Sequence, residues 1–278
     1  MKKGWKVFSV VCAVIAGTGI VLCLISFAMG GRYSDLGLSY HRVWGPFGYF
    51  NGHNGSTYDS YEVRATDSRD EFEDIKSLDI STTSCEVRIG ESDSDKVTIE
   101  TENVPKELGL KYYREGDGTF VVETKENVVT DGDDARIYID LPKDRKFSEA
   151  DLFMGAGRLY ADGIHADDLD LEVGAGYAEV SGFKANEVSA SCGAGELVLS
   201  GETLGDVDIE CGVGKIELTT PGREEDYDYS LECGVGEVRY GNRNFSGIAR
   251  EIDADNGAGK SMDISCSMGA VIVNFEGQ

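Results

Sequence analysis

Residues 169–176 read Leu-Asp-Leu-Glu-Val-Gly-Ala-Gly, and residues 207–214 read Val-Asp-Ile-Glu-Cys-Gly-Val-Gly. Each stretch ends in a motif whose two glycines flank one small apolar residue. Six copies of the motif occur, with first residues 19, 19, 19, 22 and 33 positions apart: Met154-Gly155-Ala156-Gly157-Arg158-Leu159, Val173-Gly174-Ala175-Gly176-Tyr177-Ala178, Cys192-Gly193-Ala194-Gly195-Glu196-Leu197, Cys211-Gly212-Val213-Gly214-Lys215-Ile216, Cys233-Gly234-Val235-Gly236-Glu237-Val238 and the degenerate Cys266-Ser267-Met268-Gly269-Ala270-Val271. A fixed period predicts a solenoid, in which each repeat buries its apolar face by stacking on its neighbours.

Each regular repeat contains two short strands joined by a glycine corner. Leu169, Leu171 and Val173 alternate with acidic residues, a period of two that is typical of a strand and excludes a helix. Glycines suit a bend that a Cβ atom would obstruct, and the predicted structural corners are Gly155, Gly157, Gly174, Gly176, Gly193, Gly195, Gly212, Gly214, Gly234, Gly236 and Gly269. The sequence therefore predicts an all-β fold, a single-stranded parallel β-helix (β-solenoid) with coils of about 19–22 residues over 70–278.

Stacking the motifs produces columns of equivalent positions, and three of these columns are wholly apolar. They begin with Met154, Ala156 and Leu159, and we expect all three to face the interior. The first column contains the predicted core cysteine ladder, Cys192, Cys211, Cys233 and Cys266. Buried free thiols are the favoured interpretation, because in-register parallel strands give poor disulfide geometry. Disulfides remain the alternative, since neighbouring coils about 4.8 Å apart are within reach of a bridge and the cell exterior is oxidising.

Other segments also alternate as strands do. Aligning residues 78–89 with residues 169–180 predicts an early coil that lacks the glycine corner, and further strands are expected at 96–102, 110–114, 119–125 and 136–141. The long interval 239–262 departs from the repeat and is predicted to cover an edge of the last coil. The final stretch, 270–275, has no evident cap of its own.

The N-terminus predicts a single membrane crossing. Lys2, Lys3 and Lys6 precede the uncharged segment 7–29, which as a helix would span about 34 Å. We therefore expect a cytoplasmic tail at 1–6, a transmembrane anchor at 7–29 and an extracellular remainder, so that the protein is a single-pass cell-membrane protein. A signal peptide cleaved near Ala28 is the alternative.

Residues 30–69 are rich in Gly, Ser, Asn and Tyr and are interpreted as a juxtamembrane linker that could also cap the solenoid. Its aromatic cluster, Trp44, Phe47, Tyr49 and Phe50, has a second interpretation as a patch on the membrane or on a partner.

Composition and motifs exclude several classes of function. The 51 acidic residues against 26 basic ones give a net charge of −25, which disfavours nucleic acid as a partner. There is no Cys-x-x-Cys pair, no Gly-x-Ser-x-Gly elbow and no phosphate-binding loop, and only three histidines occur. The acidic loops match no calcium-binding repeat. We therefore assign no catalytic, cofactor-binding or metal-binding residues and expect a protein that is not an enzyme.

The repeat units at 169–176 and 207–214 resemble a bacterial family of unknown function that carries the label putative adhesin and is common in Firmicutes. The resemblance covers roughly residues 70–278, and clostridial members share the order of anchor, linker and repeats. It implies a β-helix displayed outside the membrane and brings no catalytic residues. Two hypotheses follow. In one, the solenoid is a non-catalytic binding or scaffold module, a cell-surface adhesin with an extracellular ligand. In the other, it is an accessory regulator of envelope-stress sensing that acts through a membrane protein partner.

Overall fold

The computed structural model describes residues 68–125, 135–246 and 249–277. The described chain forms strands and two short 3-10 helices, η2 (Lys106–Leu108) and η3 (Glu224–Asp226). The all-β prediction is therefore confirmed. The predicted segments 1–6 and 7–29, the aromatic cluster and most of 30–69 lie outside the described residues. Within the described ranges no helix is long and apolar enough to cross a membrane.

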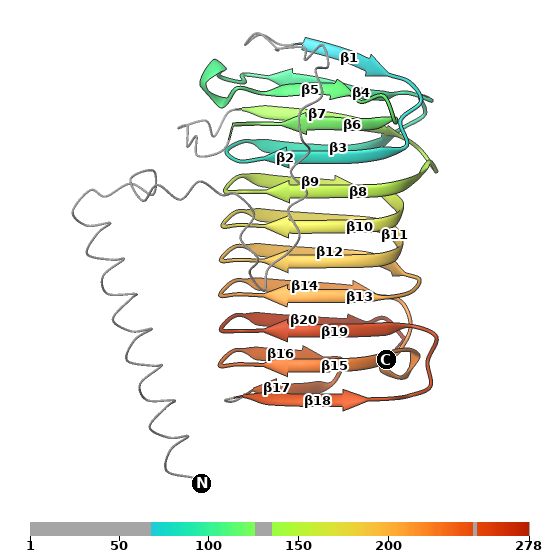
Figure 1. Ribbon diagram of the computed structural model, residues 1–278, viewed down its shortest axis with the longest axis vertical. Coiled ribbons are helices and arrows are strands. Elements are labelled where there is room, and N and C mark those ends of the chain that lie inside the picture. The colour runs from blue at the N-terminus through green and yellow to red at the C-terminus, as the bar shows by residue number, and fades with distance from the viewer. Residues whose placement is uncertain (1–67, 126–134, 247–248, 278) are drawn as a thin grey trace, which may run out of the picture. The chain divides into compact units, whose positions relative to one another are not determined.

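The strands form two faces of a flattened solenoid (Figure 1). In spatial order the first face contains β5 (Lys111–Arg114), β6 (Thr119–Glu123), β2 (Ser77–Thr82), β8 (Lys146–Met154), β10 (His165–Val173), the second half of β11 (Tyr177–Cys192), β13 (Val207–Cys211), β19 (Ser261–Cys266), β15 (Asp228–Cys233) and β18 (Arg250–Ala254). The second face contains β1 (Ser68–Phe72), β4 (Val97–Glu102), β7 (Arg136–Pro142), β3 (Glu86–Ser92), β9 (Arg158–Asp162), the first half of β11, β12 (Glu196–Thr203), β14 (Lys215–Thr220), β20 (Ala270–Phe275), β16 (Glu237–Tyr240) and β17 (Arg243–Ser246).

We call one strand of each face, joined through a corner, a rung. Inside the stack the rungs are parallel and in register, so that Leu78, Ala150 and Leu169 form one continuous column. Val87, Leu159 and Ala178 form another, and Ile89 lies beside Ala161. The prediction of an early coil at 78–89 is therefore confirmed. β11 belongs to two rungs, because the chain bends at Gly182, where φ is +63°.

The order of rungs in space differs from their order in the sequence at both ends. Rung β2/β3 lies between β6/β7 and β8/β9, and the last rung, β19/β20, lies between β13/β14 and β15/β16. The final stretch 270–275 therefore needs no cap, because β14 and β16 cover both of its edges. The sequence shows no evident cap for this stretch, whereas in the structure it forms part of an internal rung.

Antiparallel strands close both ends of the stack. β17 pairs with β16 and β18 pairs with β15, which confirms that the interval 239–262 covers an edge. Partly buried Phe245, Ile252 and Ala254 pack against the core there. At the other end β5 pairs with β6, and β4 pairs with β7 and β1. Short strands at an exposed edge reduce pairing with other chains.

The interior is a single, mostly apolar core that runs the length of the stack. Leu152, Leu171 and Ile209 from the first face are each 2% exposed or less, as are Ile216 and Leu218 from the second. Alternating side chains from both faces supply this core, and the hydrophobic effect of their burial is the main force that holds the rungs together.

Candidate functional site

The glycine corners form one long edge of the solenoid, and the residue between the two glycines points outward. Val213, Met268 and Val235 are 59%, 57% and 68% exposed, and Ala156, Ala175 and Ala194 are exposed as well. The prediction that this column faces the interior is therefore wrong. The chain turns through the corner, so the alternation of inward and outward side chains does not continue across it.

Backbone hydrogen bonds continue through the corners and hold the outward residues in a straight line. Ala194 N donates to Gly174 O at 2.8 Å, Val213 N to Gly193 O at 2.7 Å and Val235 N to Ser267 O at 2.7 Å. Successive side chains on this edge are therefore about 4.8 Å apart, the spacing of neighbouring strands. We call this line the corner ridge; in spatial order it consists of Ser84, Ala156, Ala175, Ala194, Val213, Met268 and Val235.

The ridge has large apolar side chains at one end and only serine and alanine side chains at the other. Val213, Met268 and Val235 lie on three neighbouring rungs, although they are distant in the sequence. Three of the four large hydrophobic side chains that are exposed in the described part of the chain belong to this line, and the fourth, Leu204, lies at the opposite corner. Clustered exposure of this kind is typical of an interaction surface, whereas single exposed apolar residues are ordinary.

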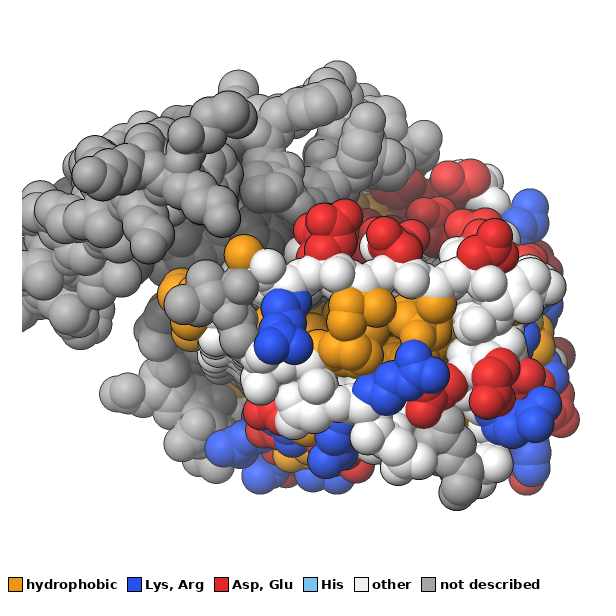
Figure 2. Space-filling model, turned by 90° about the horizontal axis from the view of Figure 1, so that it is seen from below, with side chains coloured by type: hydrophobic (Ala, Val, Ile, Leu, Met, Phe, Trp, Pro, Cys, Tyr) orange, Lys and Arg blue, Asp and Glu red, His pale blue; other side chains and the backbone are white. Residues whose placement is uncertain are grey.

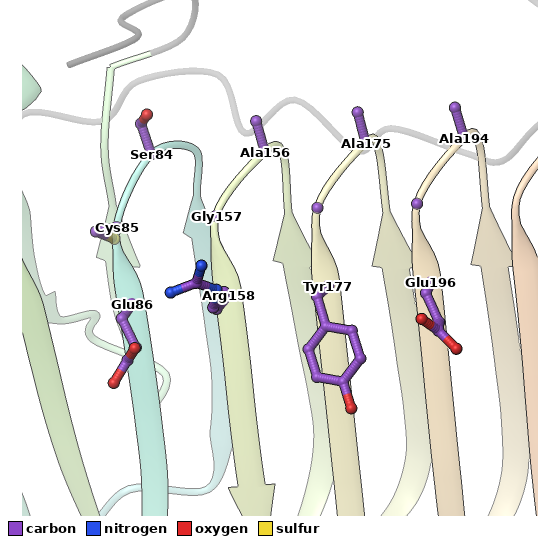
Figure 3. A pocket seen from close by; sticks show the side chains of 12 residues that line it. Ser84, Cys85, Glu86, Ala156, Gly157, Arg158, Ala175, Tyr177, Ala194 and Glu196 are labelled. Carbon is purple, nitrogen blue, oxygen red and sulfur yellow. The ribbon is translucent and has the colours of Figure 1, made fainter. Parts of the chain in front are cut away.

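A groove of about 530 Å³ runs beside the part of the ridge that extends from Ser84 to Ala194. The second glycine of each corner, such as Gly157, Gly176 and Gly195, forms its floor, and the ridge forms one wall (Figure 3). The opposite wall is a polar ladder on the second face that contains Glu86, Arg158, Tyr177 and Glu196. In Figure 3 the methyl groups of the alanines lie above the floor and the longer side chains lie below it. The groove therefore has one apolar and one charged wall.

Ion pairs and ring contacts hold the charged wall in place. Lys215 Nζ lies 3.0 Å from both Glu196 Oε1 and Glu217 Oε2, and Arg88 Nε donates to Glu86 Oε1 at 2.6 Å. The Tyr177 ring lies 5.9 Å from the Tyr160 ring. Burial and the hydrogen bond to Glu179 raise the pKa of Tyr177 to about 12, so its hydroxyl stays protonated and donates to Glu179 Oε2 at 3.0 Å. A ligand would meet fixed charges and one neutral phenol.

The groove holds no arrangement typical of catalysis. Burial raises the pKa of Cys85, at one end of the groove, to about 11, which keeps its thiol protonated and a poor nucleophile. None of the residues that line the groove is a histidine. Within the described ranges, no group of three or more His, Cys, Asp or Glu side chains is placed to hold a metal ion.

The structure places the cysteines of the repeat in the core. Cys192, Cys211, Cys266 and Cys233 follow one another in this spatial order, each 3% exposed or less, and all are free thiols. The predicted column contains the same residues, with Cys266 and Cys233 in the reverse order. A hydrogen bond with Cys266, together with burial, raises the pKa of Cys211, and burial raises that of Cys192.

The first face is acidic over most of its length. Between β2 and β18, two outward columns on it contain no lysine or arginine: Asp79, Asp151, Asp170, Ser189, Asp208, Asp263, Ser230 and Asp253 in one, and Ser81, Phe153, Glu172, Ser191, Glu210, Ser265, Glu232 and Glu251 in the other. Beyond β2 the second column continues with Glu123 and Lys111, which form an ion pair. Viewed from the β17/β18 end, acidic side chains crowd one side of the molecule, whereas the other side mixes both signs (Figure 2). Like charges directly opposite each other destabilise a sheet.

The stacking of carboxylates changes their protonation. Burial raises the pKa of Asp151 to about 7, and Glu149, Asp170, Asp79 and Asp168 add to the effect. Burial likewise raises the pKa of Asp170, Asp208, Glu172 and Glu210. In the sequence the alternation of these acids with apolar residues indicates an outward, solvated face. It does not indicate the partial burial that raises their pKa.

Comparison with known proteins finds similar solved structures and one matching family. A putative cell adhesion protein of known structure from Clostridium sporogenes is 18% identical, with a TM-score of 0.45 over 76% of this chain and 100% of that chain. A putative adhesin from Bacteroides fragilis is 13% identical, with a TM-score of 0.34 over 76% of this chain and 98% of that one. No curated protein matches the chain. The profile of the Toastrack DUF4097 family matches residues 75–221, more than half of the sequence. The chain belongs to the Toastrack DUF4097 family.

Proposed function

We propose that the protein is a non-catalytic binding or scaffold module of the adhesin type, and that it docks its partner along the corner ridge and the adjoining groove. The exposed line of Val213, Met268 and Val235 is the observation that carries this proposal. Burying these side chains against a partner would release water from apolar surface that the other described residues leave exposed.

The shape of the edge favours an elongated partner. The ridge and the glycine floor run across consecutive rungs, so a ligand that lies along them meets the same backbone geometry every strand spacing of about 4.8 Å. Repetition of this kind gives solenoids extended binding surfaces. The charged wall, with Arg158, Glu196 and Lys215, would fix the register of the partner by charge complementarity.

The proposal includes the location of the module. The segment 7–29 would anchor the protein in the cell membrane, with residues 1–6 in the cytoplasm and the solenoid outside. The regulatory alternative would act through a second protein within the membrane.

Capture from intact cells tests the proposal. The full-length chain and the fragment 70–278 are crosslinked in parallel, and the recovered material is identified. Recovery of wall polymer or of a foreign surface by the fragment supports the binding module. Recovery of a membrane sensor or transporter by the full-length chain alone would instead support accessory regulation of envelope-stress sensing. Failure of both forms to recover anything would contradict the proposal.

A further inference from the structure

The last rung of the chain is inserted between two rungs that precede it in the sequence. β19 pairs with β13 on one side and with β15 on the other, and β20 pairs with β14 and β16 in the same way. Figure 1 shows β19 and β20 between these neighbours. The two flanking rungs, β13/β14 and β15/β16, are consecutive in the sequence but do not touch through their strands in this arrangement.

The flanking rungs are in register with each other through the inserted one. Ile209 and Leu231 both lie opposite Ile264, and Cys211 and Cys233 both lie opposite Cys266. If β19/β20 left and β15/β16 moved by one strand spacing, about 4.8 Å, inward residues would meet inward residues without any slip. A slip of one residue would instead turn every side chain to the other face.

The charges on the second face fit direct pairing of the flanking rungs. Lys215 and Glu237 both lie opposite Ala270, which separates these opposite charges. In the same way Glu217 and Arg239 both lie opposite Ile272, which is half-buried on the outward side. Direct pairing would place Lys215 beside Glu237 and Glu217 beside Arg239, and opposite charges across neighbouring strands stabilise a sheet.

Asn274 of the inserted rung already connects one of these charge pairs. Its Nδ2 donates to Glu217 Oε1 at 3.2 Å, and its Oδ1 accepts from Arg239 Nη2 at 3.3 Å. The neutral amide of Asn274 thus bridges a carboxylate and a guanidinium, two groups of opposite charge that could pair directly in its absence. The corner sequences also fit direct pairing of the flanking rungs, because 211–214 and 233–236 both read Cys-Gly-Val-Gly, whereas 266–269 read Cys-Ser-Met-Gly.

The connections are long enough for both arrangements. Residues 221–227 join β14 to β15, whereas only 204–206 join β12 to β13. The inserted arrangement remains the favoured one, because it buries Met262, Ile264, Val271 and Val273. Direct pairing would also bring Glu210 opposite Glu232, an unfavourable contact.

We propose that the solenoid has two register-compatible arrangements, one with β19/β20 inserted and one with β13/β14 paired directly to β15/β16, and that it opens by releasing its C-terminal rung. Release of β19/β20 costs no more strand pairing than fraying one rung from the end of the stack, because β13/β14 and β15/β16 then pair with each other. Two packings of one sequence that share a register are a recognised basis for a conformational switch.

The native cysteines distinguish the two arrangements. In the inserted form Cys211 and Cys233 are two strand spacings apart, about 9.6 Å, which is beyond the reach of a disulfide; in the closed form they are neighbours at about 4.8 Å. The reduced full-length protein is treated with diamide under native conditions. Diamide takes one hydrogen atom from each of two thiols and becomes a hydrazine, and the resulting bridges are mapped by mass spectrometry.

The expected result is a Cys211–Cys233 bridge that accumulates with time, together with proteolytic sensitivity of residues 255–277. Glu237→Lys, which would face Lys215 only in the closed form, should lower the yield of this bridge several-fold. Glu187→Lys is the control, because Glu187 is exposed and lies in β11, which does not pair with β19/β20; it should leave the yield of the bridge unchanged. Bridges confined to Cys192–Cys211, Cys211–Cys266 or Cys266–Cys233, or no bridge at all, would overturn the proposal. Equal bridging to Cys85 would reveal global unfolding instead and would count against it too.

Discussion

Gly214 lies directly over the Sγ atom of Cys192, so that a Cβ atom added to Gly214 would be 2.6 Å from that sulfur and 2.3 Å from Gly195 O. Gly236 has the same relationship to Cys266, whose sulfur would be 2.8 Å from the added atom. The second glycine of the corner is thus required by the side chain and the backbone of the neighbouring rung. The bend alone does not explain it.

We therefore expect Gly214→Ala to lower the free energy of unfolding by about 1–3 kcal/mol, the usual range for overpacking a tight interior site. Gly90→Ala is the matched control, because nothing lies within 4 Å of its added Cβ atom. Thermal or urea unfolding of both variants measures the difference. Equal stability of the two would show that the corner has more room than the structure gives it.

The stacked carboxylates on the first face predict that acid stabilises the fold. The pKa of Asp151 is about 7 in the folded protein and 3.8 as its ordinary value, so the folded state binds a proton more tightly than the unfolded one does. This contribution to stability is complete below about pH 4 and is lost as the pH rises through 7. The melting temperature should therefore fall between pH 5 and pH 8.

Asp151→Asn removes one titrating group from the column and should flatten this dependence. Asp93→Asn, in an exposed loop outside the acidic face, should keep the slope of the unaltered protein. Melting temperatures at constant ionic strength provide the measurement, since salt screens repulsion between exposed charges. A melting temperature that rises across this pH range would contradict the assignment.

The cysteine ladder predicts thiols that a bulky reagent modifies far more slowly in the native protein than in the unfolded one. Cys192, Cys211, Cys233 and Cys266 are free and almost fully buried, so an aromatic disulfide reagent should modify them slowly in the native protein and rapidly in denaturant. The protein is purified without reductant and is assayed in both conditions. If denaturation released no reactive thiol from these positions, the ladder would be oxidised in the native protein.

Sequence periodicity predicted which residues share a column. Leu78, Val87 and Ile89 align with Leu169, Ala178 and Val180 both in the sequence and in the stack, although the early rung has no glycine corner. Alternation with a period of two is a local property of a strand, so the pattern is sufficient wherever the chain runs straight.

The same reasoning failed where the chain bends. Val213, Met268 and Val235 are apolar, and apolar residues in a repeat are usually buried, but a residue between two corner glycines lies at the tip of the turn. Only the geometry of the corner reveals this. The sequence therefore predicts these residues to be in the core, although in the structure they form the exposed surface that we propose for binding.

The order of the rungs also could not be predicted from the repeat. The coils that contain Cys211, Cys233 and Cys266 present the same inward columns, so Cys266 fits beside Cys211 as well as Cys233 would. The long interval 239–262 indicated a departure from the regular coil, but nothing in its composition specified that the chain would return to an earlier position.

In the proposed binding mode the apolar end of the corner ridge contacts the partner. The most direct measurement compares binding of the full-length protein with that of the double variant Val213→Ser, Met268→Ser to the partner captured from intact cells. Leu204→Ser is the matched control, because it removes an exposed apolar side chain from the opposite corner. We expect at least about a tenfold loss of affinity for the double variant, because two side chains that each contribute roughly 1 kcal/mol on burial are removed. The control should bind as tightly as the unaltered protein. Unchanged affinity of the double variant, or an equal loss in the control, would contradict the proposed binding mode.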